Sequence, residues 1–396
     1  MLHRPSLRKT VFRRQIAPPT DIILYGTSEK NSDFLDRPGK TVIQYGKNAG
    51  GTDLTFRSPQ APKFHQRTLA LRALTALLLL FLAGFLLFSS RRQDAAVSRS
   101  GFYFDTAVVL TGYGKRAETA LDRGIELCER YENLLSRTKE GSDLWKINHA
   151  AGQAVEVDEE TAALISRALD YASLTGGLID PTIAPLEDLW NFTGSPAGPV
   201  PEDSAISELL AHVDYTSVIV EGNTVRLKDP KAQLDLGFIA KGYIADRLKE
   251  LFLQEGLSSA LIDLGGNVLA VGAKPGADGF SVGIRRPFGS RYDALRVLSL
   301  DDRSLVSSGT YERGFEENGI WYHHILNPFT GYPARTNLAQ VTILSDSSAQ
   351  GDALSTACFL LGADAGLDLM ESIPDAEALF VLEDGSVLQT EGFPAS

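Results

Sequence analysis

Cysteine and methionine are scarce in this 396-residue chain, which has two of each. No Cys and His residues occur at the spacings that hold zinc, so the sequence excludes a structural zinc site. Cys128 and Cys358 both fall in predicted helices among apolar neighbours, where we interpret them as small buried side chains. A disulfide between them is the open alternative, because an exported domain can oxidise such a pair.

Positive charge is lacking from most of the chain. The formal net charge is −12, but residues 1–92 hold 15 Lys and Arg against 5 Asp and Glu, which leaves 23 basic and 45 acidic residues in the remainder. An acidic body repels phosphate backbones, so we exclude nucleic acid as a partner. Such a body meets an anionic cofactor through a metal ion or through local backbone donors.

Long apolar runs are also lacking, with one exception. Leu69–Phe88 is apolar apart from Arg72 near its start, and about 20 apolar residues suffice to span a bilayer. Lys63 and Arg67 precede the run and Arg91 follows it; the preceding arm is the longer and more basic, which favours a cytoplasmic N-terminus. We therefore predict a single-pass protein of the cell inner membrane with its body on the extracytoplasmic, periplasmic side. Cleavage of the run as a signal peptide is the alternative, although no small-residue cleavage pattern follows it.

This reading divides the chain into four parts. We predict a basic, disordered cytoplasmic arm over residues 1–65, a transmembrane helix over 66–90, a polar linker over 91–100 and a folded domain over 101–396. No internal repeat is present.

Within the folded part, helical and strand periodicities alternate. A first strand is predicted at Tyr103–Thr111, and helices are predicted at Lys115–Ser136, Glu159–Leu174, Ile239–Gln254 and Ala349–Leu361. Many of the strands are joined by short turns, which parallel strands do not permit. The pattern predicts an α+β or layered α/β fold with mixed, largely antiparallel sheets flanked by helices, rather than a Rossmann array.

One predicted hairpin carries the chain's adjacent histidines. Tyr311–Glu316 and Ile320–Leu326 read as strands on either side of Asn318-Gly319, a dipeptide typical of primed turns. Neighbouring side chains on a strand face opposite ways, so at most one of His323 and His324 faces a cleft and the other is structural.

Two junctions have the composition of ligand sites. At Leu234–Asp246 a strand ends and a helix begins at once, which directs backbone N–H groups and the helix dipole toward an anion, with Lys241 in the first turn. An ordinary helix start with a surface lysine is the alternative. Gly265-Gly266, within Ile262–Gly272, allows either close approach to a ligand or a plain hairpin turn.

A set of hard oxygen donors lies further along. Asp352, Ser355 and Thr356 are spaced i, i+3 and i+4 at a helix start, and a carboxylate with hydroxyls suits Mg²⁺. Capping of the helix is the alternative use of these residues. Asp180 before Pro181 is either an acceptor for a nucleobase or ribose, or a turn carboxylate.

In order along the chain, these segments read D-L-G-x-I-A-K-G-Y, then D-x-G-G-N, then S-G-x-Y-E-R…H-H-I-x-x-P-x-T-G-Y-P, then D-A-L-S-T-A. From about Gly101 to the C-terminus the chain thereby resembles the ApbE family of FAD:protein FMN transferases, and the hairpin motif is the most specific part. The resemblance implies a two-part α/β fold that holds FAD across a cleft with Mg²⁺ on its pyrophosphate. It also implies transfer of FMN through a phosphoester to a Ser or Thr of an acceptor flavoprotein, with release of AMP; the expected acceptor is a membrane redox subunit.

The resemblance assigns roles to particular residues. The FAD contacts it implies are Phe104, Thr138, Leu178, Ile179, Asp180, Asp235, Lys241 and Ile325. The metal ligands it implies are Asp352, Thr356, the backbone carbonyl of Phe238 and, in some members, the position of Ser355. The chain departs from the family's usual residues at Phe104, where Met is frequent, at Thr138, where Tyr is frequent, and at Phe238, where small residues are usual.

The chemistry also asks for a general base that takes the proton of the acceptor hydroxyl. We assign this role to His324, with His323 second. Two alternatives to the transferase are an FAD pyrophosphatase that yields FMN and AMP, and a non-catalytic, membrane-anchored flavin-binding protein.

Overall fold

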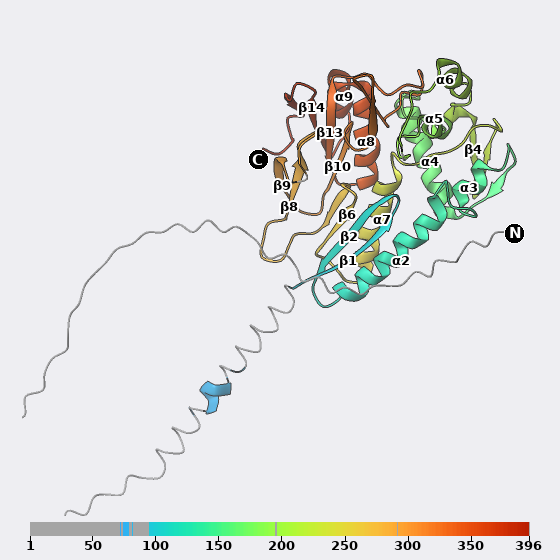
Figure 1. Ribbon diagram of the computed structural model, residues 1–396. Helices are drawn as coiled ribbons and strands as arrows, with labels where there is room; N and C mark the ends of the chain where they lie inside the picture. The colour runs from blue at the N-terminus through green and yellow to red at the C-terminus, as the bar shows by residue number, and fades with distance from the viewer. Residues whose placement is uncertain are drawn as a thin grey trace, which may run out of the picture. The chain divides into compact units, whose positions relative to one another are not determined.

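The computed structural model describes residues 72, 74–78, 81, 95–194, 196–290 and 292–395 (Figure 1). Arg72, Leu74–Leu78 and Phe81 are helical. The predicted arm over residues 1–65 and the rest of the predicted membrane helix over 66–90 lie outside the described residues. In the part of the chain that is described, no helix is both long and apolar enough to cross a membrane.

An eight-stranded sheet forms the centre of the folded body, and all of its paired neighbours are antiparallel. Its strands, in spatial order, are β1 (Ala96–Tyr103), β2 (Thr106–Tyr113), β6 (Ala260–Leu264), β7 (Val268–Val271), β10 (Ser304–Gly309), β13 (Leu338–Ser345), β14 (Ala376–Leu382) and β15 (Val387–Gln389). The largely antiparallel α+β fold predicted from the sequence is confirmed.

Four helices pack on this sheet. They are α2 (Ala117–Leu135), α7 (Ala240–Gln254), α8 (Ser348–Leu361) and α9 (Ala363–Glu371). The α2 and α7 helices share one apolar core with β2 and β6, whereas α8 packs on β10 and β13 (Figure 1). The hairpin of β8 (Phe280–Arg285) and β9 (Ala294–Leu300) forms a separate core with residues of β10, β13 and β14. The sheet thereby brings α7 and α8 together, and their first turns form the centre of the candidate site.

The remaining elements lie outside this sheet, and several of them share the apolar core of α2 and α7. They are α3 (Asp143–Asn148), β3 (Val155–Glu156), α4 (Glu159–Leu174), α5 (Ala184–Trp190), α6 (Asp203–Leu210), the 3₁₀ helix η1 (Tyr215–Ser217), β4 (Val218–Glu221), β5 (Thr224–Leu227), β11 (Gly314–Glu317) and β12 (Ile320–His323). Trp190 is fully buried and stacks on Phe192, with the ring centroids 5.6 Å apart. Phe315 and Tyr322 of the β11–β12 hairpin pack on the same aromatic cluster, which anchors that hairpin to α5.

Two sequence predictions need correction. β1 begins at Ala96, so residues 96–100 belong to the sheet and not to a linker. The strand predicted at Tyr103–Thr111 is a hairpin, because Phe104 and Asp105 take φ of 54° and 56° and turn the chain back. Cys128 and Cys358 are buried free thiols, in agreement with their interpretation as small buried side chains, and burial raises the pKa of each to about 12. The four predicted helices are confirmed to within two residues at each end.

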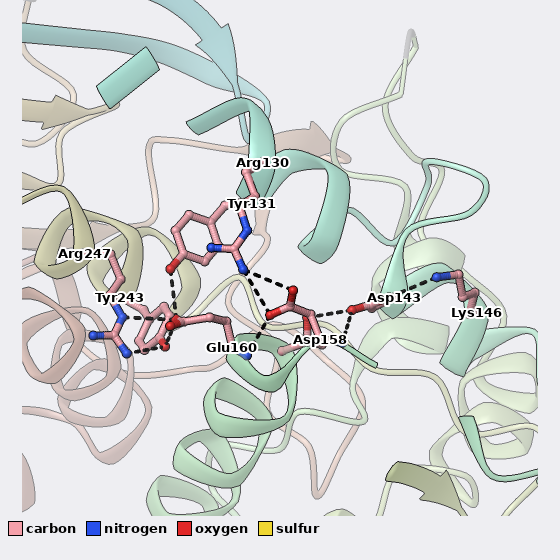
Figure 2. A network of polar contacts seen from close by, with 9 residues as sticks. Arg130, Tyr131, Asp143, Lys146, Asp158, Glu160, Tyr243 and Arg247 are labelled. Atoms are coloured by element: carbon pink, nitrogen blue, oxygen red, sulfur yellow. Dashed lines mark hydrogen bonds and ion pairs between the residues drawn. The ribbon is translucent and has the colours of Figure 1, made fainter. Parts of the chain in front are cut away.

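A polar network fastens α4 to α2 and α7 (Figure 2). The Glu160 carboxylate accepts hydrogen bonds from the hydroxyls of Tyr131 (3.0 Å) and Tyr243 and from Nε of Arg247 (3.1 Å). Burial alone would raise the pKa of Glu160, but the two hydroxyls and the Arg247 charge outweigh it and lower this pKa. The ionised carboxylate is therefore the form that stabilises the three-helix contact.

We expect Glu160→Gln to lower the free energy of unfolding by about 1 to 3 kcal/mol, since it weakens charge-assisted hydrogen bonds in a partly buried network. A group with a lowered pKa contributes stability above its ordinary pKa and loses it as the pH falls. The difference from wild type should therefore shrink below the ordinary Glu value of 4.5. Urea unfolding at several pH values measures this. Glu250→Gln is the control, because Glu250 contacts the same Arg247 (2.6 Å) from the exposed surface.

Candidate functional site at the junction of α7 and α8

The site centres on a close approach of the first turns of α7 and α8. A Cβ atom at Gly242 would lie 2.2 Å from the backbone oxygen of Ser348, so only glycine fits there. The Gly242 N–H donates to Oδ2 of Asp352 across the junction (2.9 Å). The D-L-G-x-I-A-K-G-Y segment is thus joined to D-A-L-S-T-A, 110 residues further on.

One hydrogen bond and one free carbonyl define this junction. Gly242 is the third residue of α7, and the N–H groups in the first turn of a helix have no partner within the helix. The Gly242 N–H donates to Asp352, and no described donor reaches the carbonyl of Phe238, which leaves a free oxygen just before the helix start. Asp352 and Phe238, two of the residues expected as metal ligands, therefore both lie at the start of α7.

The Asp352 carboxylate is buried, and the groups around it only partly compensate its negative charge. It is 5% exposed, and burial raises its pKa, while the Lys241 charge and the Gly242 N–H act in the opposite direction. The Asn267 amide also favours the charged form, yet its buried Nδ2 lacks a partner at normal hydrogen-bond geometry. A buried anion with few donors is stabilised further by a nearby cation.

The residues present fit a divalent cation. Asp352 offers a carboxylate, Phe238 a free carbonyl, and Thr356 a hydroxyl whose contact to the Asp352 carbonyl is long at 3.5 Å. Three hard oxygens from protein leave positions for water and phosphate, which is the usual shell of Mg²⁺. No cluster of three or more His, Cys, Asp and Glu holds a metal within the described ranges, so such a site depends on the carbonyl and the hydroxyl.

Ser355 lies apart from this set. Its fully buried hydroxyl donates to the Asp352 carbonyl (2.8 Å) and shares a hydrogen bond with Ser308 of β10 (2.7 Å). These contacts put the hydroxyl on the face of α8 that packs on the sheet. They do not support the expected ligand role of Ser355.

The two histidines differ in what their ring nitrogens contact. His323 is buried; its Nε2 donates to the Ala334 carbonyl (3.0 Å) and its Nδ1 accepts from the Ile325 N–H (3.3 Å). Burial lowers its pKa to about 4, so it is neutral and both nitrogens are used within the fold. His323 is therefore the structural member of the pair.

His324 has a free nitrogen. Its Nδ1 lies 3.2 Å from the Arg313 carbonyl, and because a carbonyl only accepts, Nδ1 carries the proton and Nε2 is left with its lone pair. Desolvation, followed by the charge of Arg313, lowers the pKa of His324 to about 3, and Lys241 contributes in the same sense. The interaction with Lys241 links His324 to Asp352, since Lys241 acts on both.

The apolar residues expected to contact FAD come together. Ile325 and Ile179 are buried in one cluster, and Leu178 and Phe238 pack against it. Asp180 follows these residues, and both of its oxygens accept hydrogen bonds within the fold, from Thr182 (2.8 and 2.6 Å) and from the Tyr215 N–H of η1 (2.9 Å). Its carboxylate therefore ties the turn at Thr182 to η1.

The other expected contacts lie on different elements. Phe104 occupies the β1–β2 turn, where its N–H donates to Glu132 of α2 (2.7 Å). Thr138 is exposed after α2, and its hydroxyl lies 3.3 Å from that of Ser136. Among the described residues, no hydrogen bond or ion pair joins either residue to Asp352 or Lys241.

Arg137 is a member of this region that sequence reasoning missed. Its guanidinium pairs with three carboxylates, those of Asp235 (2.8 Å), Asp188 (2.7 Å) and Glu187 (3.5 Å). Desolvation and the charge of Asp235 raise the pKa of Glu187. Asp235, an expected FAD contact, is thus held by Arg137 and by the Gly237 N–H (2.5 Å). The partners are about 50 to 100 residues apart, and no spacing in the sequence signals their contact.

The antiparallel sheet and its flanking helices define an α+β domain with a hard-oxygen junction at one helix start, and solved structures share this fold. The ApbE protein of Thermotoga maritima superposes with a TM-score of 0.70 at 35% identity, covering 75% of this chain and 97% of that protein. The family model for ApbE matches residues 104–380. The chain belongs to the ApbE family.

Curated relatives agree with this assignment. The FAD:protein FMN transferase of Treponema pallidum is 37% identical over 322 residues, which are 76% of this chain and 89% of that protein. A Klebsiella pneumoniae protein of the same name is 36% identical over 274 residues, 68% of this chain and 84% of that one. The flavin transferase ApbE from Vibrio cholerae, at 24% identity and a TM-score of 0.67, shares the fold.

We expect Gly242→Ala to lower the free energy of unfolding by about 1 to 3 kcal/mol, because the added methyl meets backbone rather than a flexible side chain. The better helix propensity of alanine, worth about 1 kcal/mol, offsets only part of this. The same change should weaken Mg²⁺-dependent FAD binding, since it moves the N–H that holds Asp352.

Thermal unfolding and a binding titration measure the two effects. Gly283→Ala is the matched control, because a Cβ there lies at an ordinary 3.5 Å from Ala294. An equally stable Gly242→Ala protein would show that the two helices do not need this close approach.

Proposed function

We propose that this protein is an FAD:protein FMN transferase that moves FMN from FAD to a Ser or Thr hydroxyl of an acceptor flavoprotein and releases AMP. The observation that carries the proposal is the junction of Asp352, the free Phe238 carbonyl and Lys241, which suits a pyrophosphate with its cation. The names of the relatives support the same reaction.

The transfer is a substitution at phosphorus. The acceptor hydroxyl oxygen forms a bond to the FMN phosphorus, the bond from that phosphorus to the bridging oxygen breaks, and AMP leaves with the bridging oxygen. The hydroxyl proton passes to Nε2 of His324, the free ring nitrogen. Such reactions depend mainly on positioning and on neutralising charge.

Asp352, Thr356 and the Phe238 carbonyl would hold Mg²⁺, which supplies charge neutralisation at the pyrophosphate when bound. Lys241 adds a second positive charge beside the same junction, and its closeness to Asp352 keeps it there. The cluster of Ile325, Ile179 and Leu178 offers an apolar wall to the flavin nucleotide and limits access of water.

We further propose that residues 66–90 anchor the protein in the cell inner membrane, with the transferase domain on the periplasmic side. The long apolar run and the more basic preceding arm support this topology. A membrane redox subunit is then the natural acceptor, since it is confined to the same membrane.

One assay separates the transferase from the two alternatives. The full-length chain is incubated with FAD, Mg²⁺ and a periplasmic domain of a flavoprotein that offers Ser and Thr residues. Flavin covalently attached to the acceptor supports the transferase; free FMN and AMP without attachment support a pyrophosphatase. FAD that is bound but unchanged supports a non-catalytic flavin-binding protein.

A further inference from the structure

A second cavity lies behind the β11–β12 hairpin. It has a volume of about 580 Å³, and it is lined by β12, by the segment that leads into β13, by the end of β14 and by the β8–β9 turn. His323 lines it, whereas His324, the next residue, does not. β12 ends at His323, so His324 follows the strand and lies outside the lining of this cavity.

The cavity follows the open edge of β12. Ile320, Trp321 and His323 all line it, so it borders the strand along its length rather than on one face. β12 pairs only with β11 among the described strands, in a two-stranded sheet. Its other edge therefore offers backbone groups that can pair with an added extended strand.

Positive charge gathers here although the body of the chain is acidic. Arg335 is exposed, stacks over the ring of Tyr322 (5.6 Å) and has no carboxylate within 4 Å among the described residues. Arg286 also lines the cavity and contacts Asp293 only at 3.4 Å. Glu383 is the one acidic residue in the lining, so the charge of the lining is positive.

An exposed aromatic residue marks the rim. Phe288 is 66% exposed and lies in a turn closed by a hydrogen bond from the Gly289 N–H to the Arg286 carbonyl (3.1 Å). Its φ is 57°, a conformation that normally selects glycine at this turn position after proline. The Phe288 ring meets that of Tyr311 edge-on, with the centroids 5.9 Å apart, but most of it stays exposed. Together with the partly exposed Trp321 it offers an apolar contact to an incoming chain.

We propose that this cavity is the docking groove for the acceptor flavoprotein, and that it takes an extended, acidic segment near the modified Ser or Thr. The segment pairs with the free edge of β12, its carboxylates meet Arg335 and Arg286, and an apolar side chain rests on Phe288 and Trp321. The inference rests on the proposed function. It gives the hairpin two uses, because β12, which ends immediately before His324, also aligns the chain that carries the hydroxyl.

The chain's own N-terminal region does not match this groove. Residues 1–92 hold 15 basic against 5 acidic residues, so they have the same sign of charge as Arg335 and Arg286. FAD does not match either, since the groove lacks Asp352, Lys241 and the other residues of the junction.

Binding and transfer are tested separately with the full-length chain. Two fluorescein-labelled peptides share a central Thr in an extended sequence, and one has Asp and the other Lys at the flanking positions. Fluorescence anisotropy gives the affinity of each peptide, and mass spectrometry in the presence of FAD and Mg²⁺ gives FMN transfer. The variants are Arg335→Glu, Phe288→Gly and, as a matched charge reversal at an exposed site on another element, Arg116→Glu.

We expect the acidic peptide to bind more tightly than the basic one, and the preference to weaken with salt. Arg335→Glu should reduce acidic-peptide affinity about tenfold, because attraction becomes repulsion, and should improve binding of the basic peptide. Phe288→Gly should weaken both peptides while preserving the turn, and Arg116→Glu should change neither. FAD affinity should stay unchanged throughout.

Equal binding of the two peptides, or an Arg335→Glu protein with unchanged affinities, would overturn the docking groove. So would the absence of peptide binding by a protein that binds FAD. Anisotropy does not depend on catalysis, so a protein that binds the acidic peptide but transfers no FMN to any acceptor contradicts the proposed function and leaves the groove supported.

Discussion

Asp352→Asn is expected to lower FMN transfer by about 10³-fold, because removal of the carboxylate expected to hold the metal removes several kcal/mol of charge stabilisation from the reaction. Asparagine has the same shape and keeps an oxygen that accepts from the Gly242 N–H. The geometry of α7 and α8 is therefore retained while the charge is lost.

Stability should move in the opposite direction from activity. Burial raises the pKa of Asp352, so the folded state binds more protons than the unfolded state as the pH rises past the ordinary value of 3.8. In the wild type, the contribution of Asp352 to the free energy of unfolding therefore falls as the pH rises. Asp352→Asn cannot ionise, so its free energy of unfolding should not show this fall. At neutral pH the variant should be at least as stable as the wild type, in the absence of Mg²⁺.

Calorimetry with and without Mg²⁺, together with the rate of AMP release, checks both expectations. Mg²⁺ should stabilise the wild type and not the variant. Ser355→Ala is the control, since its hydroxyl faces β10, and its transfer rate should change less than about threefold. An active Asp352→Asn protein, or a strongly impaired Ser355→Ala protein, would contradict the assignment of the metal site.

The sequence predicted elements with strong periodicity or strong turn signals. α4 and the Asn318-Gly319 turn were predicted where they occur, and Asn318 and Gly319 take φ of 55° and 77° as a primed turn requires. The turn at Phe104 and Asp105 was missed because neither residue is typical of positive φ next to strand-forming neighbours.

The site was less accessible to sequence reasoning. Residue type alone identified Asp352 and Thr356 as hard donors, but the position of Asp352 beside the start of α7 depends on a hydrogen bond from the Gly242 N–H, 110 residues earlier. A long-range hydrogen bond of this kind has no local pattern. The ion pairs of Arg137 with Asp188 and Asp235 were missed for the same reason.

His324→Ala is expected to lower the rate of FMN transfer by about 10² to 10⁴-fold, the usual contribution of a general base. FAD binding should stay near wild type, since the imidazole is assigned to the acceptor's proton and not to the nucleotide. His323→Ala is the contrasting variant. It leaves the buried Ala334 carbonyl and Ile325 N–H without partners, so its main effect should be a loss of about 1 to 3 kcal/mol of stability.

The pH dependence sharpens this test. With a pKa of about 3, His324 is already deprotonated in the free enzyme, so kcat/KM should show no loss from this group until the pH approaches that value. Because the pKa of His324 is lowered in the folded state, this residue contributes fully to the free energy of unfolding above its ordinary pKa of 6.5. That contribution is lost as the pH falls toward 3, and the free energy of unfolding of His324→Ala should lack this pH dependence.

Bound FAD should raise the pKa of His324. Its pyrophosphate brings negative charge to a nitrogen whose pKa is lowered in part by Arg313 and Lys241, so the pKa should rise in the complex. The acidic limb of kcat, which reports the complex, should therefore lie at higher pH than that of kcat/KM, which reports the free enzyme. Coincident limbs, or a His324→Ala enzyme with the wild-type profile, would assign the proton transfer to another group. A base that is weak in the free enzyme and strengthens when the nucleotide binds would take the hydroxyl proton only once FMN is in place to be transferred.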